Sequence, residues 1–306
     1  MTPTATSASL VDSRPRSLGS LGDVGPIALG QWRFTGDDAT SAQALVETAL
    51  DAGINLVDTA DVYGLDFGGS GFGACEELLG NVLAGTPSLR DRMVLATKGG
   101  IAPPTPYDTS PAALRDACEA SLQRLQTDVI DLYQVHRHDM LSHPAVVAAT
   151  LSELRDEGKI REVGVSNHAP AQVDALAAHL SFPLLTNQPE YSAVHLDPLR
   201  DGTFDQCMRD GTVPLVWSPL AGGRLATGDD VRPELLELLD GLAERESVDR
   251  ATIALAFALA HPARPVAIIG TQRADRITSS LAALDVTLDR ADVYSIIQAS
   301  EGAPLP

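Results

Sequence analysis

The sequence contains few cysteines, and none is placed to form a familiar site. Of its 306 residues only three are cysteine, namely Cys75, Cys118 and Cys207, and no two of them form a C-x-x-C pair. We therefore expect neither a disulfide framework nor a cysteine-ligated zinc site. A reducing compartment is the expected environment of such a chain.

Positive charge and long apolar segments are also scarce. The chain has 22 Lys and Arg against 41 Asp and Glu, a formal net charge of −19. This balance argues against non-specific nucleic-acid binding, which needs clustered cations. No apolar run reaches the roughly 18 residues of a membrane helix, and residues 1–16 lack the apolar core of a signal peptide. We therefore expect a cytoplasmic protein with no membrane and no nucleic-acid partner.

Short apolar runs alternate with amphipathic helical stretches along almost the whole chain. Most of these runs are continuously apolar, which is typical of strands buried on both faces in a parallel sheet. The runs are 26–29, 54–57, 93–97, 130–135, 162–165, 184–187, 213–217 and 266–269. The helical stretches include 41–52, 111–125, 144–157, 169–179, 198–210 and 250–261.

Eight such units in succession predict a closed (β/α)₈ barrel, with an open doubly wound sheet as the alternative. The chain shows no internal repeat and no linker, so we expect one domain over residues 14–306, after a mobile tail at 1–13. Three glycines before the first run predict a small β-hairpin at residues 14–25 that caps the barrel bottom. Residues 271–300 are expected to add further helices at the C-terminal end.

Polar side chains with complementary chemistry follow three successive runs. Asp58 and Tyr63 come after the run at 54–57, Lys98 comes directly after the next, and His136 directly after the third. In barrel enzymes the site forms where strands end and the following loops begin. Each residue alone has an ordinary alternative role: Asp58 as a helix or turn cap, Tyr63 as a packed side chain, Lys98 as a solvated lysine and His136 as a loop histidine. Because all four follow strands at equivalent positions, a common pocket is favoured.

The chemistry that this set suits is proton delivery to a carbonyl group. A phenol has an ordinary pKa of about 10 and is a weak acid at neutral pH. A nearby ammonium lowers that pKa, a carboxylate paired with the ammonium keeps it charged, and an imidazole can orient the substrate oxygen. No side chain can supply a hydride, so the electrons are expected from a cofactor.

The chain resembles the aldo-keto reductase superfamily from about residue 14 to about residue 284. Eight segments carry the resemblance in order, at the spacing of a barrel. They are GINLVDTADVYG (53–64), ACEELLG (74–80), LATKGG (95–100), SLQRLQTDVIDLYQVHRHD (121–139), LRDEGKIREVGVSNH (154–168), TNQPEYS (186–192), WSPLAGGRL (217–225) and IIGTQRADRI (268–277). By this resemblance Tyr63 is the general acid, Lys98 lowers its pKa, Asp58 holds Lys98, and His136 orients the carbonyl.

The resemblance also implies a nicotinamide cofactor, NADPH, bound across the barrel mouth. Ser166, Asn167 and Gln188 match residues that hydrogen-bond the carboxamide, and Trp217 stands where the family places an aromatic ring on the nicotinamide. The matching pyrophosphate loop contributes Ser218, Leu220 and Gly222. The residues that match the adenosine and 2′-phosphate segment are Gly270, Thr271, Gln272, Arg276 and Ser280.

The adenosine segment departs from the family at two positions. Gly270 and Thr271 stand where many members have Lys and Ser. Arg276 nevertheless matches the arginine that faces the 2′-phosphate, and Arg273 is a second candidate. An arginine can bind a phosphate through two parallel hydrogen bonds, so we expect NADP to be preferred over NAD.

The loop at 64–75 is about twice as long as in the family, and its glycines predict mobility. We expect Trp32, Phe67 and Tyr107 to contact the substrate, with Phe72 as a further lining or lid residue. These residues carry no code for one carbonyl compound, and aldoses, steroids, pyridoxal-type aldehydes and xenobiotic ketones all fit. The same loop contains a G-x-G-x-x-A pattern at 69–74, which lies too far from its strand for a dinucleotide fingerprint.

The sequence leaves two other functions open. One is an NADPH-sensing binding subunit that turns over little and couples the cofactor to a partner. The other is a metal-dependent barrel hydrolase built on His136 and His138, although we expect no metal because no further ligands follow on later strand ends. The leading prediction is an NADPH-dependent reductase of an aldehyde or ketone. Family members range from monomers to larger assemblies, and the sequence favours no single state.

Overall fold

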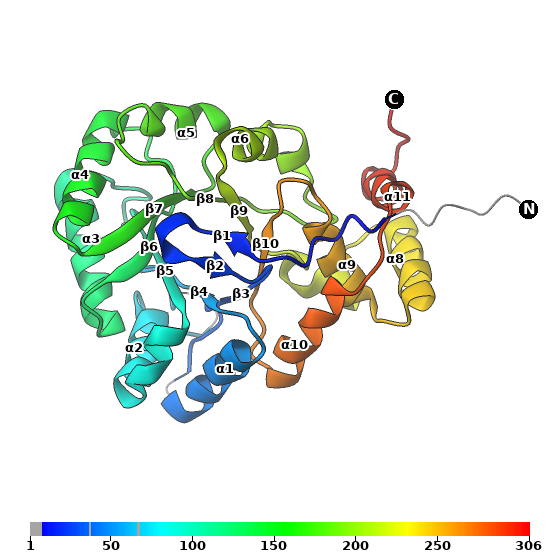
Figure 1. Ribbon diagram of the computed structural model, residues 1–306, viewed down its shortest axis with the longest axis horizontal. Helices are drawn as coiled ribbons and strands as arrows, with labels where there is room; N and C mark the ends of the chain where they lie inside the picture. Colours follow the sequence, from blue (N-terminus) through cyan, green and yellow to red (C-terminus); the bar gives the residue numbers. More distant parts are fainter. Residues whose placement is uncertain (1–7, 37, 66–67) are drawn as a thin grey trace, which may run out of the picture.

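The computed structural model describes residues 8–36, 38–65 and 68–306. Within this part of the chain, eight parallel strands close into a barrel in the order β10-β3-β4-β5-β6-β7-β8-β9, which confirms the predicted (β/α)₈ fold. Figure 1 shows these strands at the centre with the helices around them. The strands are β3 (Ile27–Gly30), β4 (Leu56–Asp58), β5 (Val94–Gly99), β6 (Ile130–Val135), β7 (Ile160–Ser166), β8 (Thr186–Gln188), β9 (Val213–Val216) and β10 (Val266–Ile269).

The strands are continuously apolar because each of them faces two apolar layers. Residues that point outward pack with the helices in one large core cluster, as Val57 and Val163 do. Residues that point inward, such as Leu56 and Leu132, form a smaller cluster inside the barrel. The parallel register pairs Asp58 with Ala96 and Lys98 with Gln134, so successive strand ends lie at neighbouring levels.

The predicted hairpin is present and closes the amino-terminal end of the barrel. β1 (Arg16–Ser17) pairs with β2 (Asp23–Val24) in antiparallel fashion, and Figure 1 shows the pair crossing in front of the barrel strands. Leu18 and Val24 are fully buried in the inner cluster. The hydroxyl of Ser20 donates to Glu162 near the start of β7. The hairpin therefore leaves the opposite mouth for the site.

Capping residues mark the starts of several outer helices. Ser110 accepts a hydrogen bond from the backbone of Ala113 at the start of α3, where Pro111 occupies the first turn. Asp249 caps α9 in the same way through Thr252. The helices are α1 (Ala39–Asp51), α2 (Ala74–Gly85), α3 (Pro111–Leu125), α4 (Pro144–Asp156), α5 (Pro170–Ala177), α6 (Thr203–Asp210), α7 (Arg224–Thr227), α8 (Pro233–Glu246), α9 (Arg250–Leu259), α10 (Ala274–Ser279) and α11 (Arg290–Glu301).

The stretch at 198–210 differs from the single helix expected there. It splits into a short 3-10 turn at Asp197–Leu199 and α6, because Gly202 adopts a left-handed backbone with φ of 87°. The C-terminal helices are present as expected, and α11 packs on α8 at one end of the molecule (Figure 1). Ser9 and Leu10, inside the segment expected as a tail, hydrogen-bond the carbonyls of Val286 and Leu288.

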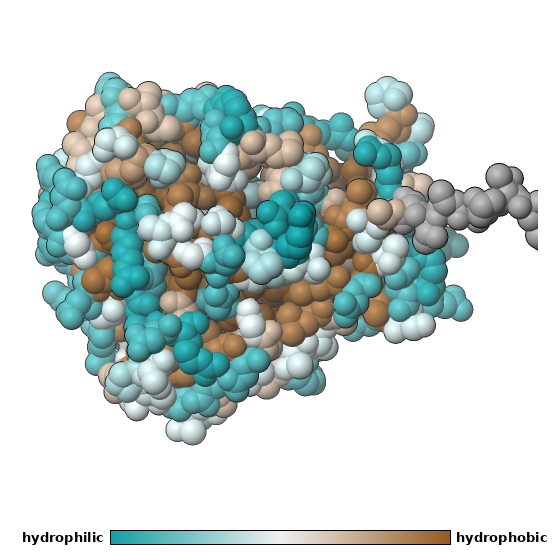
Figure 2. All heavy atoms as spheres, in the orientation of Figure 1, coloured by the Kyte–Doolittle hydropathy of each residue, from teal (hydrophilic) through white to brown (hydrophobic). Residues whose placement is uncertain are grey.

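Hydrophilic side chains cover the outer helices on the face that carries the hairpin. Hydrophobic residues show mainly toward the middle of this face, around the hairpin (Figure 2). A search of the described residues finds no helix with the length and apolar character needed to span a membrane.

Candidate active site

Asp58 and Lys98 form a buried ion pair at the ends of β4 and β5. The Lys98 Nζ lies 2.7 Å from the Asp58 Oδ2, and both side chains are almost completely shielded from solvent. The same ammonium donates to the carbonyl of Thr59 at 2.8 Å and to the Tyr63 hydroxyl at 3.1 Å. The three N–H bonds of the ammonium therefore have three acceptors, and one of them is the phenol.

Tyr63 sits in the loop after β4, with its ring half-buried beside this ion pair. Burial raises the pKa of the Tyr63 phenol above its ordinary value, because the charged phenolate loses its hydration. The ammonium of Lys98 acts in the opposite direction but does not outweigh burial. Lys98 thus acts on the pKa of Tyr63 in the expected direction and limits the rise that burial causes.

His136 directly follows β6 and faces Tyr63. Their rings meet edge to face, with centroids 5.8 Å apart. Burial, together with the positive charges of Lys98 and Arg137, holds the pKa of His136 well below its usual range. The imidazole is therefore neutral at physiological pH. Its Nδ1 is buried and has no hydrogen-bond partner among the described residues. A neutral imidazole and a phenol thus lie close together at the barrel mouth.

The second oxygen of Asp58 is held by two glutamines. Gln188 donates to the Asp58 Oδ1 at 2.9 Å and Gln134 donates to it at 3.2 Å. The Gln134 side-chain oxygen in turn accepts from the Thr186 hydroxyl at 3.2 Å. Gln134 and Thr186 are not among the site residues predicted from the sequence. The signal for Gln134 was present, because it interrupts an apolar strand two residues before His136 and therefore points to the same side.

The residues predicted to bind the nicotinamide lie in one hydrogen-bonded chain. The indole N–H of Trp217 donates to the Asn167 Oδ1 at 2.9 Å, and the Asn167 Nδ2 donates to the Ser166 Oγ at 2.8 Å. The Ser166 hydroxyl donates to the carbonyl of Gln188 at 3.0 Å. Because Gln188 also contacts Asp58, this chain connects the expected cofactor residues to the ion pair.

The loop expected to hold the pyrophosphate has a tight, left-handed backbone. Ser218 and Gly222 have φ of 56° and 70°, and the Ser218 Oγ accepts from the backbone N–H of Gly222 at 2.9 Å. The carbonyl of Leu220 accepts from Gly223 at 2.9 Å. Arg33, in the loop after β3, donates to the Gly222 carbonyl at 3.1 Å; β3 and β9 both flank β10 in the barrel. The guanidinium of Arg33 therefore lies beside a loop in which several residues have a left-handed backbone.

The adenosine segment follows β10, and its two arginines differ in their partners. Arg273 forms an exposed ion pair with Asp275 at 2.6 Å. Arg276 lies on α10 with its side chain exposed and has no ion pair within the described part of the chain. Ser280 is turned back onto its own helix, since its hydroxyl donates to the Ile277 carbonyl. The three residues between β10 and Arg273 are Gly270, Thr271 and Gln272, and all three are exposed or half-buried.

The residues expected to contact substrate are only partly gathered. Trp32 is 39% exposed in the loop after β3, and Tyr107 is half-buried in the loop before α3. Phe67 lies outside the described residues. Phe72 lines a cavity of about 510 Å³ between α3 and the loops after β4 and β5, where its ring lies 5.7 Å from the Arg124 guanidinium.

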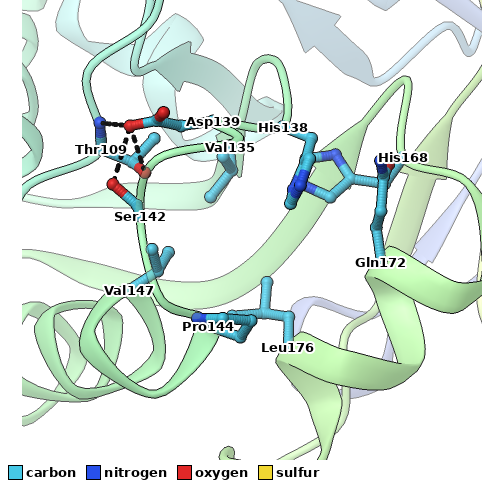
Figure 3. Close-up of a pocket in the computed structure, with 10 residues that line it drawn as sticks. All are labelled: Thr109, Val135, His138, Asp139, Ser142, Pro144, Val147, His168, Gln172 and Leu176. Carbon is cyan, nitrogen blue, oxygen red and sulfur yellow. Dashed lines mark hydrogen bonds between the residues drawn. The ribbon is translucent and has the colours of Figure 1, made fainter.

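His138 lies apart from His136, in a small pocket beside α4 and α5. Its ring meets that of His168 edge to face at 5.6 Å, and Asp139 holds the loop through Thr109 and Ser142 (Figure 3). The lining of this pocket does not include His136. Among the described residues, no three His, Cys, Asp or Glu side chains come together in a way that could hold a metal ion.

Comparison with known proteins gives a consistent assignment. Residues 26–301 match the aldo/keto reductase family. The chain is 48% identical to a 6-dehydroglucose reductase of Novosphingobium aromaticivorans over 295 residues, which cover 95% of this chain and 97% of the relative. It is 35% identical to a 6-dehydroglucose reductase of Agrobacterium fabrum, with coverage of 88% and 92%.

Solved structures show the same architecture. A Klebsiella pneumoniae aldo/keto reductase in complex with NADP and acetate superposes with a TM-score of 0.76 at 26% identity, over 96% of this chain and 97% of that chain. A thermostable aldo-keto reductase bound to the inhibitor epalrestat gives a TM-score of 0.79 at 24% identity, over 94% and 99%. The family match, the two curated relatives and the shared barrel lead to one conclusion: the chain belongs to the aldo/keto reductase family of oxidoreductases.

Proposed function

We propose that this oxidoreductase uses NADPH to reduce an aldehyde to an alcohol, with Tyr63 as the general acid. The observation that carries the proposal is the Lys98 ammonium, which touches both the buried Asp58 carboxylate at 2.7 Å and the Tyr63 hydroxyl at 3.1 Å. This arrangement supports proton transfer from the phenol, because the phenolate that remains lies next to a fixed positive charge.

His136 complements the phenol in this proposal. A neutral imidazole can donate a hydrogen bond to the carbonyl oxygen without competing as a stronger acid. Tyr63 then transfers its proton to that oxygen, Lys98 stabilises the phenolate, and Asp58 keeps the ammonium in place. His136 and Tyr63 meet edge to face, so one oxygen atom at the mouth can contact both.

The nicotinamide coenzyme, when bound, supplies the hydride that no side chain can supply. The donors and acceptors of the mouth fit such a group. Ser166, Asn167 and Gln188 offer polar atoms for the carboxamide, and Trp217 offers a ring face. The turned backbone at Ser218, Leu220 and Gly222, with Arg33 beside it, suits a pyrophosphate.

Arg276 favours NADP over NAD in this proposal. Its guanidinium is exposed on α10, whereas Arg273 already carries an ion pair with Asp275. A charge without a competing carboxylate is the better phosphate ligand. Gly270, Thr271, Gln272 and Ser280 then surround the adenosine. The Klebsiella pneumoniae structure with NADP supports the same choice.

For the substrate we propose a sugar aldehyde, 6-dehydroglucose. Two relatives at 48% and 35% identity carry this activity in their names. Trp32 and Tyr107 supply ring surfaces at the mouth, and aromatic rings suit the apolar faces of a sugar as well as flat carbonyl compounds. The substrate is thus a small carbonyl molecule, and no macromolecular partner enters the reaction.

The test is turnover by the purified protein with NADPH and a panel of carbonyl compounds that includes 6-dehydroglucose. We expect oxidation of NADPH with 6-dehydroglucose, and a 10²–10⁴-fold lower kcat in Tyr63→Phe, because general acid catalysis contributes about that factor. NADPH affinity should not change in the variant. An equal rate in Tyr63→Phe would show that another group supplies the proton. Tight NADPH binding with no turnover on any compound would instead support the sensing subunit.

A further inference from the structure

A pair of polar side chains lies inside the barrel beside the ion pair, since Gln134 is in register with Lys98. Gln134 on β6 and Thr186 on β8 are both fully buried, in a position that barrels normally fill with branched apolar side chains. Neither residue belongs to the predicted site. Burying an amide and a hydroxyl is unfavourable unless both are hydrogen-bonded, so their partners indicate what they do.

Gln134 acts on the oxygen of Asp58 that Lys98 does not use. The Lys98 ammonium binds the Asp58 Oδ2 at 2.7 Å, while the Gln134 Nε2 lies 3.2 Å from the Oδ1. Gln188 donates to the same oxygen at 2.9 Å. Both oxygens of the Asp58 carboxylate are thus hydrogen-bonded, and rotation about the Cβ–Cγ bond would break contacts at each oxygen.

The Asp58 carboxylate determines which end of the Gln134 amide faces it, and Thr186 completes the hydrogen bonding of the other end. An ionised carboxylate only accepts hydrogen bonds, so the amide must present its nitrogen to Asp58. The amide oxygen then faces the Thr186 hydroxyl, which donates to it at 3.2 Å. With the amide reversed, two oxygens would face each other at Asp58 and the Thr186 hydroxyl would have to accept. The carboxylate therefore selects the orientation, and the Thr186 hydroxyl supplies the donor that the amide oxygen needs.

Gly164 on β7 makes this contact possible. β7 lies between β6 and β8, and Gly164 is in register with both Gln134 and Thr186. A Cβ at position 164 would lie 2.0 Å from the Thr186 Oγ1 and 3.2 Å from the Gln134 Cγ. Only glycine leaves room for side chains from two non-adjacent strands to meet across it.

We propose that Gln134 and Thr186 are positioning residues for the reduction. Gln134 holds Asp58 in the rotamer that keeps the Lys98 ammonium bonded to Tyr63, and Thr186 holds Gln134. Among the described residues, neither side chain hydrogen-bonds the phenol or a residue assigned to the cofactor. This inference rests on the proposed function, since it assumes that Tyr63 delivers the proton.

The experiment compares Thr186→Val with Thr186→Ser. Valine keeps the shape of threonine but removes the O–H donor, whereas serine keeps the donor and removes a methyl group. We expect Gln134→Leu to lower kcat for aldehyde reduction by about tenfold or more, because it removes a hydrogen bond to a charged group. Thr186→Val should lower kcat by roughly two- to tenfold, because the bond it removes is to a neutral amide. KM for NADPH should stay within twofold, and Thr186→Ser should keep kcat near that of the wild type.

Equal kcat in Thr186→Val and the wild type would overturn the proposal. So would an equal fall in the valine and serine variants, because packing rather than the hydroxyl would then matter. A second readout is independent of turnover: the resonance of Tyr63 in protein made with isotope-labelled tyrosine. In Thr186→Val the chemical shift of this resonance should change toward the value found in Lys98→Met. In Thr186→Ser it should match that of the wild type. A wild type that reduces no aldehyde, with the Tyr63 resonance still responding in this way, would count against the proposed function alone.

Discussion

Replacement of Lys98 by methionine should uncouple the ion pair and reveal how much it contributes to folding and catalysis. Methionine keeps most of the length of the lysine side chain and removes its charge. In the wild type, burial acts to lower the pKa of Lys98, but Asp58 and Tyr63 outweigh it, so the net pKa lies above the ordinary value. The ammonium is therefore stabilised by its partners, and its removal leaves Asp58 charged and enclosed.

The size of the effect follows from the geometry. Unit charges 2.7 Å apart attract by roughly 6 kcal/mol at an effective dielectric constant of about 20. The variant also no longer buries an ammonium, which offsets part of the lost attraction. We therefore expect the free energy of unfolding to fall by about 3–5 kcal/mol. In the double variant Lys98→Met/Asp58→Asn neither position of the pair carries a charge, and most of this loss should be recovered.

The assay is urea unfolding followed by tryptophan fluorescence, combined with steady-state kinetics. Both the single and the double variant should lose 10²–10⁴-fold in kcat, because neither can stabilise the Tyr63 phenolate. Lys159→Met is the control, since Lys159 pairs with Glu119 and Glu157 at the surface and should change stability by less than about 1 kcal/mol. If the double variant is as unstable as Lys98→Met, unpaired charge is not the cause and the reasoning fails.

Three further predictions concern other parts of the molecule. Arg276→Ala should raise KM for NADPH more than for NADH in steady-state assays, and Arg273→Ala should do so less; equal effects on both coenzymes would remove Arg276 from the 2′-phosphate. Burial lowers the pKa of His168 from 6.5 to about 4, so the unfolded chain takes up a proton below about pH 6.5 that the folded chain does not. His168 alone should therefore lower the free energy of unfolding by up to about 1.4 kcal/mol per pH unit between pH 6.5 and 4.5, and His168→Gln should show a correspondingly shallower slope in urea titrations at several pH values. Gly164→Ala should cost about 1–3 kcal/mol of stability through overpacking, whereas Gly85→Ala, where a Cβ meets nothing within 4 Å, should be close to neutral in the same assay.

Much of the barrel could be predicted because its signals are local. Continuous apolar runs identified the strands, and α3 begins and ends where expected because Ser110 and Pro111 mark its start. The error at 198–210 has a local cause as well. Apolar spacing there is compatible with one helix, but the left-handed backbone at Gly202 ends it, and periodicity alone does not report such a break.

The site was predictable only where a residue stands at a strand end. Asp58, Lys98 and His136 could be placed together because parallel strands in a barrel end at one mouth. Phe72 could not be placed this way, because a long loop allows many paths, and the structure turns the ring toward Arg124 and α3. His138 is likewise near His136 in the sequence but packs against His168 in space.

The sequence by itself determined the order of strands and helices, the hairpin at the barrel bottom and the strand ends that carry Asp58, Lys98 and His136. These features depend on periodicity, turn residues and position along a strand, all of which can be recognised in a short stretch of sequence. Only the tertiary structure decided that Gln134 and Thr186 meet across Gly164 to hold Asp58, and that burial outweighs Lys98 at Tyr63. Such contacts depend on how the closed barrel brings non-adjacent strands together and removes water, and no local pattern in the chain encodes either.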